Sequence, residues 1–434
     1  MPTLALKSAR LLDPSQDLDQ AADVLIDRAK GVIARIGKRL KGDEELDCRG
    51  LVVCPGFIDI HVHLREPGFT SKETIATGTA AAVHGGFTSV VTMPNTDPPL
   101  DNTASIAYQF LQGRNADKAR LYPMGCITRA RAGQELAELG LLARAGAIAF
   151  TDDGSCVPSA FILRSALEYA NSLGRVIVEH CEDPELSQGA IMHEGKISAA
   201  LGINGYPSAA EEIVVARDIR LCKLAAARFH VQHISAKGSV ALVREAKRKG
   251  VRVSAEVAPH HLLLTDDCCK TFDPVYRMNP PLRESSDTEA CLEGLLDGTI
   301  DCFASDHAPH TIEEKTLEFT VAPNGVIGLE SSVGVLLTKL VATGRLPLKR
   351  FVEAWTTSAA RCLGLPAGTL QAGAPADLTL LDLDLKWKLD TSLFQSKARN
   401  CPFAGWELKG APVYTIVGGK LFEAIGRTAR KSGS

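Results

Sequence analysis

Short apolar runs alternate with amphipathic stretches through the middle of the chain. The amphipathic stretches 72–84 and 239–249, for example, each lie between two runs of strand-like composition. This alternation is typical of βα units around a parallel sheet. The candidate strands are residues 57–64, 88–94, 120–127, 147–151, 176–180, 230–234, 252–257 and 301–305. Eight such strands predict a closed (β/α)8 barrel of the TIM type, with a doubly wound open sheet as the alternative.

Both ends of the chain have a different pattern, in which short β-like runs are separated by turns. The runs are 3–6, 22–26, 31–36 and 51–54 at one end, and 376–383 and 413–420 at the other. Two β-rich ends around a different middle predict a small composite β-sandwich built from both termini. We therefore expect residues 1–54 and 369–434 to form the sandwich and residues 55–368 to form the barrel. The tail 427–434 is expected to fray.

Composition and charge narrow the class of ligand. The chain has 48 basic and 51 acidic residues and a net charge of −3, so no basic excess points to nucleic acid or to a membrane surface. A small-molecule substrate is favoured. The sequence shows neither a membrane-spanning apolar run nor a signal-peptide pattern. Its twelve cysteines are scattered without a CxxC pair, which indicates reduced thiols in a cytoplasmic protein.

Six possible metal ligands fall at or just beyond the C-terminal ends of candidate strands. His61 and His63 are two residues apart on the first strand, so their side chains are expected to share a face. The ends of later strands add Asp153, His180, His233 and Asp306. Barrel active sites form at this end of the strands. Four imidazoles and two carboxylates that meet there would suit zinc, with a position left open for water.

Each of these residues also has an ordinary structural explanation when it is taken alone. His180 or His233 could be a hydrogen-bonded core histidine, and Asp306 could cap a helix. Asp152 and Asp153 could cap the helix that follows them. We favour the metal site because the structural explanation requires six independent coincidences at one end of the barrel.

Four segments carry a more specific pattern. They are PGFIDIHVHLREPG (55–68), MPNT (93–96), FTDDG (150–154) and ASDHAPH (304–310). On these segments the chain resembles the amidohydrolase superfamily, and within it the bacterial type I dihydroorotases. The resemblance extends over essentially the whole chain, and the first and last segments together are highly specific.

The resemblance implies how the ligands divide between ions. His61 and His63 would hold the more buried ion with Asp306, and His180 and His233 would hold a second ion. His307, beside Asp306, is expected to face away from the metals and to support the site indirectly. We expect the remaining histidines to be structural or non-catalytic: His84, His193, His230, His260 and His261.

The number of ions depends on Asp153. Related hydantoinases bridge two metals with a carboxylated lysine from the fourth strand, but this chain has no lysine between Lys118 and Lys196. Asp153 stands at the corresponding strand end, as in similar dihydroorotases. A plain carboxylate can contact one ion or bridge two, so one and two zinc ions per subunit both remain open.

The implied reaction is the reversible cyclisation of N-carbamoyl-L-aspartate to dihydroorotate, a step of pyrimidine biosynthesis. In the hydrolytic direction, water activated by the metal would attack the ring amide, with Asp306 as general acid and base. Arg65 is two residues beyond His63, hence expected on the same strand face, and can grip the substrate carboxylate. By resemblance, further substrate contacts come from His63, Asn95, Asn279, His310, Asn324 and Gly325.

Alternatives to these roles are open. Arg65 could instead pair with Glu66 at the surface, and Asn95 and Asn279 could be turn residues. The chain could be a hydantoinase or allantoinase, although these typically lack the arginine and expect the lysine. It could also be a catalytically inactive homologue that scaffolds aspartate carbamoyltransferase, although its ligand positions are intact. The resemblance further implies a complex with that transcarbamoylase and a homodimer, and the loop 311–326 is expected to close over substrate.

Overall fold

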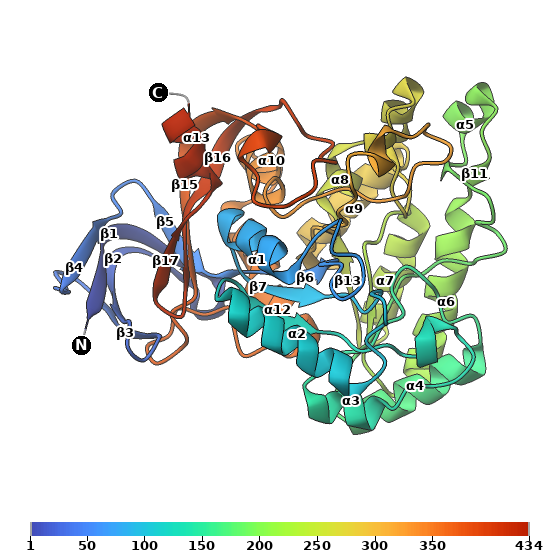
Figure 1. Cartoon of the computed structure of the whole chain (residues 1–434), viewed down its shortest axis with the longest axis horizontal. Coiled ribbons are helices and arrows are strands. Elements are labelled where there is room, and N and C mark those ends of the chain that lie inside the picture. Colours follow the sequence, from blue (N-terminus) through green and yellow to red (C-terminus); the bar gives the residue numbers. More distant parts are fainter. Residues whose placement is uncertain (1, 433–434) are drawn as a thin grey trace.

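Strands from both ends of the chain lie side by side in one sheet in the computed structural model, which describes residues 2–432 (Figure 1). The order is β17-β16-β15-β5-β1-β2-β3, and β4 pairs with β1. The first five strands are β1 (Thr3–Asp13), β2 (Leu18–Asp27), β3 (Val32–Gly37), β4 (Glu44–Asp47) and β5 (Val52–Pro55). The last three are β15 (Leu378–Lys388), β16 (Glu407–Val417) and β17 (Lys420–Glu423). The prediction that both termini build one β-rich unit is confirmed.

This terminal sheet has an apolar cluster of its own. Residues two apart on one strand, such as Leu4 and Leu6 on β1 or Leu378 and Leu380 on β15, are buried in it together. Such spacing places side chains on one face of a strand, so the strands of the two ends share one core.

Parallel strands form the middle of the chain in two groups. One contains β6 (Phe57–Val62), β7 (Phe87–Thr92) and β8 (Arg120–Pro123). The other contains β9 (Ile177–Glu179), β12 (Phe229–Val231), β13 (Val253–Val257) and β14 (Cys302–Phe303). Phe150 joins the groups by bridges to Gly125 and Ile177, and a bridge between Val62 and His307 leads from the last strand back to the first. The pairing therefore runs round eight segments, as the predicted barrel requires.

Helices surround these strands and follow most of them in sequence (Figure 1). The longer ones are α1 (Ile75–His84), α2 (Thr103–Ala116), α3 (Leu139–Ala145), α4 (Ala160–Ser172), α6 (Ser208–Leu224), α7 (Lys237–Arg248), α9 (Ser285–Asp297), α11 (Leu348–Trp355) and α12 (Thr357–Leu363). The shorter elements are β10 (Met192–His193), α5 (Lys196–Leu201), β11 (Gly205–Tyr206), α8 (Pro259–Leu263) and α10 (Ser332–Leu336). Within residues 2–432, no helix has the length and apolar character that crossing a membrane requires.

Local sequence fixes the bounds of α1. Thr74 and Thr77 form a reciprocal capping box, so the helix begins at Ile75 rather than at the predicted residue 72. It ends at His84, and the next residue is the C-cap Gly85, where a Cβ atom would lie 1.9 Å from the carbonyl oxygen of Leu329. Only glycine fits that close approach of two backbones.

Polar contacts fasten the terminal sheet to the barrel. The hydroxyl of Thr379 on β15 accepts from the N–H of Phe57 at 3.0 Å and donates to the carbonyl of Gly86 at 2.7 Å. Arg120 at the start of β8 makes a two-pronged ion pair with Asp377, at 2.6 and 3.0 Å. The tail beyond β17 also differs from expectation: it forms α13 (Ile425–Ser432), which packs against β16, instead of fraying over its whole length.

Candidate metal centre

Two histidines of the first barrel strand face the barrel interior. His61 lies within β6 and is fully buried, and its ring centroid is 5.3 Å from that of His63. His63 follows β6, and its N–H donates to the carbonyl of His307 at 2.8 Å, next to the bridge between the last and first strands. The predicted shared face of the two imidazoles is therefore present.

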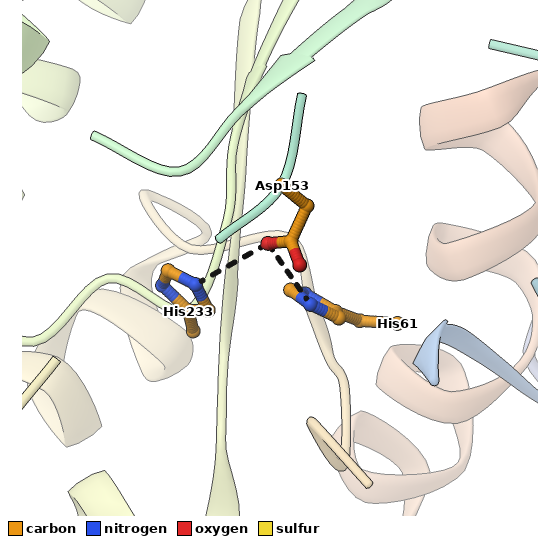
Figure 2. A group of neighbouring side chains, drawn as sticks. All are labelled: His61, Asp153 and His233. Atoms are coloured by element: carbon orange, nitrogen blue, oxygen red, sulfur yellow. Dashed lines mark ion pairs between the residues drawn. The ribbon is translucent and has the colours of Figure 1, made fainter. Parts of the chain in front are cut away.

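Asp153 lies between His61 and His233 (Figure 2), and it is also close to His63. One carboxylate oxygen, Oδ1, is 3.3 Å from His61 Nε2 and 3.8 Å from His233 Nε2. The other, Oδ2, is 3.5 Å from His63 Nε2. The carboxylate of Asp153 is thus close to the imidazoles of three histidines.

Asp306 and His180 complete the predicted set. Asp306 Oδ1 lies 3.2 Å from His63 Nε2 and 3.5 Å from His61 Nε2. His180 Nδ1 is 2.9 Å from His233 Nε2. All six predicted ligands therefore meet at the C-terminal ends of the strands. Two sets have ligand atoms that lie mutually within 4.8 Å: His61, Asp153 and His233, and His61, His63 and Asp306.

Buried atoms without hydrogen bonds show that this cluster suits a cation. His61 Nε2 and Asp153 Oδ1, although close to each other, lack a hydrogen bond in the described part of the chain, and so does His233 Nδ1. Buried polar atoms normally have a partner. Burial opposes charge on His61, but the carboxylates of Asp153, Glu256 and Asp306 raise its pKa well above the usual range. The centre therefore favours positive charge, which a divalent ion would supply.

Glu256 on β13 contacts the candidate site, although the sequence did not predict it. Its carboxylate accepts from His61 Nδ1 at 2.6 Å, which turns Nε2 toward the cluster, and it lies 3.1 Å from His230 Nε2. Burial would raise the pKa of Glu256, but the two histidines lower it to about 2. A single acidic residue within the apolar run VSAEV was the signal that could have identified it.

Glu182 holds the other side of the site in a similar way. Its carboxylate is 2.6 Å from His180 Nε2 and accepts from the Asn279 side chain at 2.7 Å. Although burial opposes the charge, His180 lowers the pKa of Glu182 to about 2. His180 therefore has one nitrogen at His233 and the other on a carboxylate.

A cavity of about 220 Å³ opens above these residues. All seven predicted substrate-binding residues line it: His63, Arg65, Asn95, Asn279, His310, Asn324 and Gly325. Asp153, His180, His233 and Asp306 line it as well, whereas His61 lies beneath it, fully buried. The predicted metal ligands and the predicted substrate contacts thus belong to one site.

Arg65 reaches this cavity for a different reason from the one predicted. The strand β6 ends at Val62, and Arg65 adopts a φ of 61°, so a shared strand face does not place it. Its Nε donates to the carbonyl of Pro309 at 3.2 Å. Burial lowers the pKa of Arg65 to about 10, so it keeps its charge at neutral pH. Surface pairing with Glu66 is ruled out, because that carboxylate accepts from Ile75 N–H at 2.8 Å and Tyr108 hydroxyl at 2.6 Å.

Other predicted contacts hold one another in place. Asn95 Oδ1 lies 2.9 Å from His63 Nδ1, and His310 Nε2 lies 2.8 Å from the carbonyl of Asn324. Burial, together with Arg65 and Lys72, lowers the pKa of His310 to about 3, so its ring is neutral. The loop 311–326 is fastened by Lys315, whose Nζ donates to the carbonyls of Pro274, Arg277 and Pro323 at 3.0, 3.2 and 2.8 Å.

The neighbours of the ligands behave as supports. His307 points away from the cluster, with Nε2 3.4 Å from Glu73 and Nδ1 accepting from the N–H of Gly328 at 3.3 Å. Asp152 does not cap the following helix: it accepts from the N–H groups of Ile127 and Thr128 at 2.9 and 3.1 Å. It therefore fixes the turn from which Asp153 projects.

Comparisons with known proteins identify the family. A family model described as dihydro-orotase-like matches residues 50–239. The dihydroorotase of Pelotomaculum thermopropionicum is 51% identical over 420 residues, which cover 96% of this chain and 98% of that protein. The chain belongs to the dihydroorotase family. Another dihydroorotase, from Anaeromyxobacter dehalogenans, is 46% identical over 98% of this chain and 99% of its own length.

Comparison with solved structures shows that this chain has the fold of hydantoinases and dihydropyrimidinases. An L-hydantoinase (dihydropyrimidinase) from Arthrobacter aurescens superposes with a TM-score of 0.88 at 29% identity, over 98% of this chain and 97% of that one. A dihydropyrimidinase from Brevibacillus agri gives a TM-score of 0.85 at 25% identity, over 98% and 95%. These likenesses support the predicted barrel with a β-sandwich.

Proposed function

We propose that this chain catalyses the reversible cyclisation of N-carbamoyl-L-aspartate to (S)-dihydroorotate and water, a step of pyrimidine biosynthesis. One observation carries the proposal: Arg65 and the histidine–aspartate cluster line the same 220 Å³ cavity. The substrate has a carboxylate next to an amide, and this cavity offers a partly buried cation next to a candidate metal centre. Family membership supports the same reaction, because the relatives are named dihydroorotases.

The proposed cofactor is zinc, one or two ions per subunit. Imidazole and carboxylate ligands suit zinc, and the unpartnered atoms of His61 and Asp153 support binding at the cluster. When bound, such an ion polarises a carbonyl group and lowers the pKa of water. Asp153 contacts imidazoles of both predicted ion sites, so it is the residue that would join them.

Asp306 is the proposed general acid and base. Its carboxylate lines the cavity beside His63, where it can take a proton from water and deliver it to the leaving ring nitrogen. Burial would raise the pKa of Asp306, but His61 and His63 lower it well below the usual range. A carboxylate so stabilised is a weak base, so its contribution lies mainly in its position.

The remaining residues would orient the substrate. Arg65 would bind the carboxylate through two parallel hydrogen bonds, with Asn95 and His310 beside it. Asn279 and the backbone groups of Asn324 and Gly325 would hold the ring amides. Asn95 and Asn279 are already fixed by His63 and Glu182, so ordering them on binding should cost little conformational entropy.

The competing functions fit these residues less well. Hydantoinases share the fold, but the predicted bridging position holds Asp153, and an arginine at the cavity has no carboxylate to bind on an uncharged ring. An inactive scaffold would not need the complete ligand set. A complex with aspartate carbamoyltransferase, a homodimer and closure of the loop 311–326 stay predictions. We extend the proposal to a cytoplasmic location, with which twelve free cysteines are consistent.

The proposal is tested with Asp306→Asn, which keeps the shape of the side chain and removes its charge. Purified wild type should contain zinc and interconvert carbamoyl-aspartate and dihydroorotate, with and without the transcarbamoylase. The variant should lose at least about 100-fold in kcat, since positioned acid–base groups contribute 10²–10⁴-fold. Wild-type activity on hydantoin or allantoin instead of dihydroorotate would overturn the proposal.

A further inference from the structure

A second group of reactive side chains lies at the opposite ends of the barrel strands. A cavity of about 200 Å³, which we call the lower cavity, is lined by residues at the starts of β9, β12, β13 and β14 and by residues of α12. Cys362 lines it, together with Arg228, Arg252 and Arg361. The metal centre, in contrast, lies at the C-terminal strand ends, so the two sites are separate.

Cys362 has a second thiol directly behind it. Its Sγ is 3.9 Å from Sγ of Cys302 on β14. Cys302 is completely buried, whereas Cys362 keeps 8% of its surface exposed at the lower cavity. A reagent that enters the cavity therefore meets Cys362 first, and Cys302 stands where a resolving thiol would be needed.

The surroundings of Cys362 favour its thiolate. The neighbouring Cys302 thiol and, against the effect of burial, the His230 imidazole lower the pKa of Cys362 below the ordinary thiol value. The other eleven cysteines of the described chain have raised pKa values, in each case with burial as the largest cause. The thiolate is the nucleophilic form. Among the twelve thiols, Cys362 is the one prepared to react.

The lower cavity has an excess of positive charge, although its carboxylate, Asp301, raises the pKa of Cys362. Three guanidinium groups line it, and its one acidic residue, Asp301, is already paired with Lys247 at 2.6 Å. Nearby cations stabilise a thiolate. The cavity therefore combines access, positive charge and a second sulfur atom.

We propose that Cys362 and Cys302 form an oxidation site at which a hydroperoxide produces a reversible disulfide. The Cys362 thiolate attacks the outer peroxide oxygen, the O–O bond breaks, and the leaving oxygen takes a proton and departs as water or an alcohol. Cys302 then attacks the sulfur of the resulting sulfenic acid, the S–O bond breaks and water leaves. The two thiols lose two electrons in total, and the peroxide gains them.

This disulfide would affect the metal centre through β14. The two sulfur atoms must approach from 3.9 Å to about 2.05 Å, which draws β14 and α12 together. Asp306 follows four residues after Cys302 on this segment. A shift of about 1 Å in a catalytic group can lower a rate about 100-fold. Loss of activity on oxidation rests on the proposed function, whereas the cross-link itself does not.

The experiment treats the full-length reduced protein with hydrogen peroxide, blocks the remaining thiols and maps its peptides without reduction. We expect the loss of two hydrogen atoms per chain, a joined Cys302–Cys362 peptide pair, and a fall in dihydroorotase activity that dithiothreitol restores. Oxidation of other cysteines without this pair would overturn the proposal. A cross-link that leaves activity unchanged would overturn its effect on the metal centre.

Matched variants sharpen the test. Cys362→Ala should abolish the cross-link, and Cys222→Ala, which removes another buried thiol, should leave it intact. If Cys362→Ala fails to fold, the peptide map of the wild-type protein still decides. If the reduced wild type lacks dihydroorotase activity, the proposed function fails, and the cross-link remains a separate result.

Discussion

Glu256 sets the orientation of the deepest predicted ligand. Its hydrogen bond to His61 Nδ1 at 2.6 Å leaves Nε2 to face Asp153 and Asp306. Carboxylates that hold metal-bound imidazoles in this way fix the tautomer of the ring and raise its basicity. The position of a residue that touches no metal therefore matters to metal affinity.

Glu256→Gln should weaken zinc binding about 10- to 100-fold, the usual effect of losing such a partner. The amide keeps the size of the side chain but removes the charge shared by His61 and His230. Competition with a chromogenic chelator measures the affinity. Glu168→Gln, at an exposed position on α4, is the control and should bind zinc as the wild type does. Equal affinities for all three proteins would contradict the supporting role of Glu256.

Arg65 is partly buried at the cavity, and no carboxylate of residues 2–432 pairs with it. Arg65→Met should raise KM for dihydroorotate about 10- to 100-fold, since hydrogen bonds to charged groups are worth about 1.5–3 kcal/mol. Dihydrouracil, which lacks the carboxylate, provides the internal control in steady-state assays. A similar loss on both rings would show that Arg65 shapes the cavity instead of binding the carboxylate.

At the scale of elements, seven of the eight predicted barrel strands are present but shorter than predicted, whereas residues 147–151 form no strand and contribute only the isolated bridges of Phe150. The sequence favoured residues 301–305 as a strand, yet β14 is Cys302–Phe303, and the N–H of Ser305 donates to the Asp59 side chain at 3.1 Å. His233 and Asp306 have φ values of 25° and 48°. The chain thus leaves the strand conformation where the ligands begin, and apolar pattern alone carries no sign of that change.

The same limit explains which site residues could be predicted. The positions of His180 and Asp306 at the ends of predicted strands were enough to predict that they belong to the site, because the C-terminal ends of all barrel strands lie at the same end of the barrel. The pairing of Glu256 with His61 joins residues 195 positions apart, so neither local spacing nor charge pattern shows it. Arg65 was found through its place in the motif, although the strand argument for its direction was wrong.

The junction of α1 with the segment around Leu329 gives a prediction about packing. Gly85→Ala should destabilise the protein by about 3 kcal/mol or more, at or above the upper end of ordinary overpacking, because the new Cβ would meet a backbone oxygen at 1.9 Å. Urea unfolding measures the difference. Gly37→Ala is the control, since its nearest neighbour is the Leu40 side chain at 3.6 Å. Equal midpoints for the two variants would contradict this account of α1.

For the whole molecule, stability should depend on pH through His230. Burial opposes protonation of this ring, but the neighbouring Cys362 and the hydrogen bond with Glu256 raise its pKa to about 10, against about 6.5 in an unfolded chain. A raised pKa gives stability that is complete below about pH 6.5 and is lost as pH rises toward 10. The folded state is therefore expected to weaken over that range.

Thermal unfolding of the metal-free protein between pH 6.5 and pH 10 tests this expectation. The midpoint of the wild type should fall more steeply with pH than that of His230→Gln, which cannot bind the extra proton. Comparison of the two proteins removes the contribution of groups whose pKa values do not depend on His230, which excludes Cys362 and Glu256. Parallel curves would mean that His230 is not protonated in the folded state.

The joining of the two chain ends could be predicted in outline from their β-rich pattern. The means of fastening could not, because the Thr379 hydroxyl and the Arg120–Asp377 pair act between segments more than 250 residues apart. The strands from the two chain ends form one continuous sheet because β15 pairs with β5 in antiparallel orientation. The amino-acid composition of the two segments does not predict this pairing.

Asp153 has one further consequence for the whole molecule. A carboxylated lysine, implied for hydantoinases at this position, forms only when the amine captures dissolved carbon dioxide. Asp153 carries its carboxylate from translation, and it already lies 3.3 Å from His61 and 3.8 Å from His233. Assembly of this centre should therefore be indifferent to bicarbonate, and zinc added to degassed apoprotein should suffice to restore it.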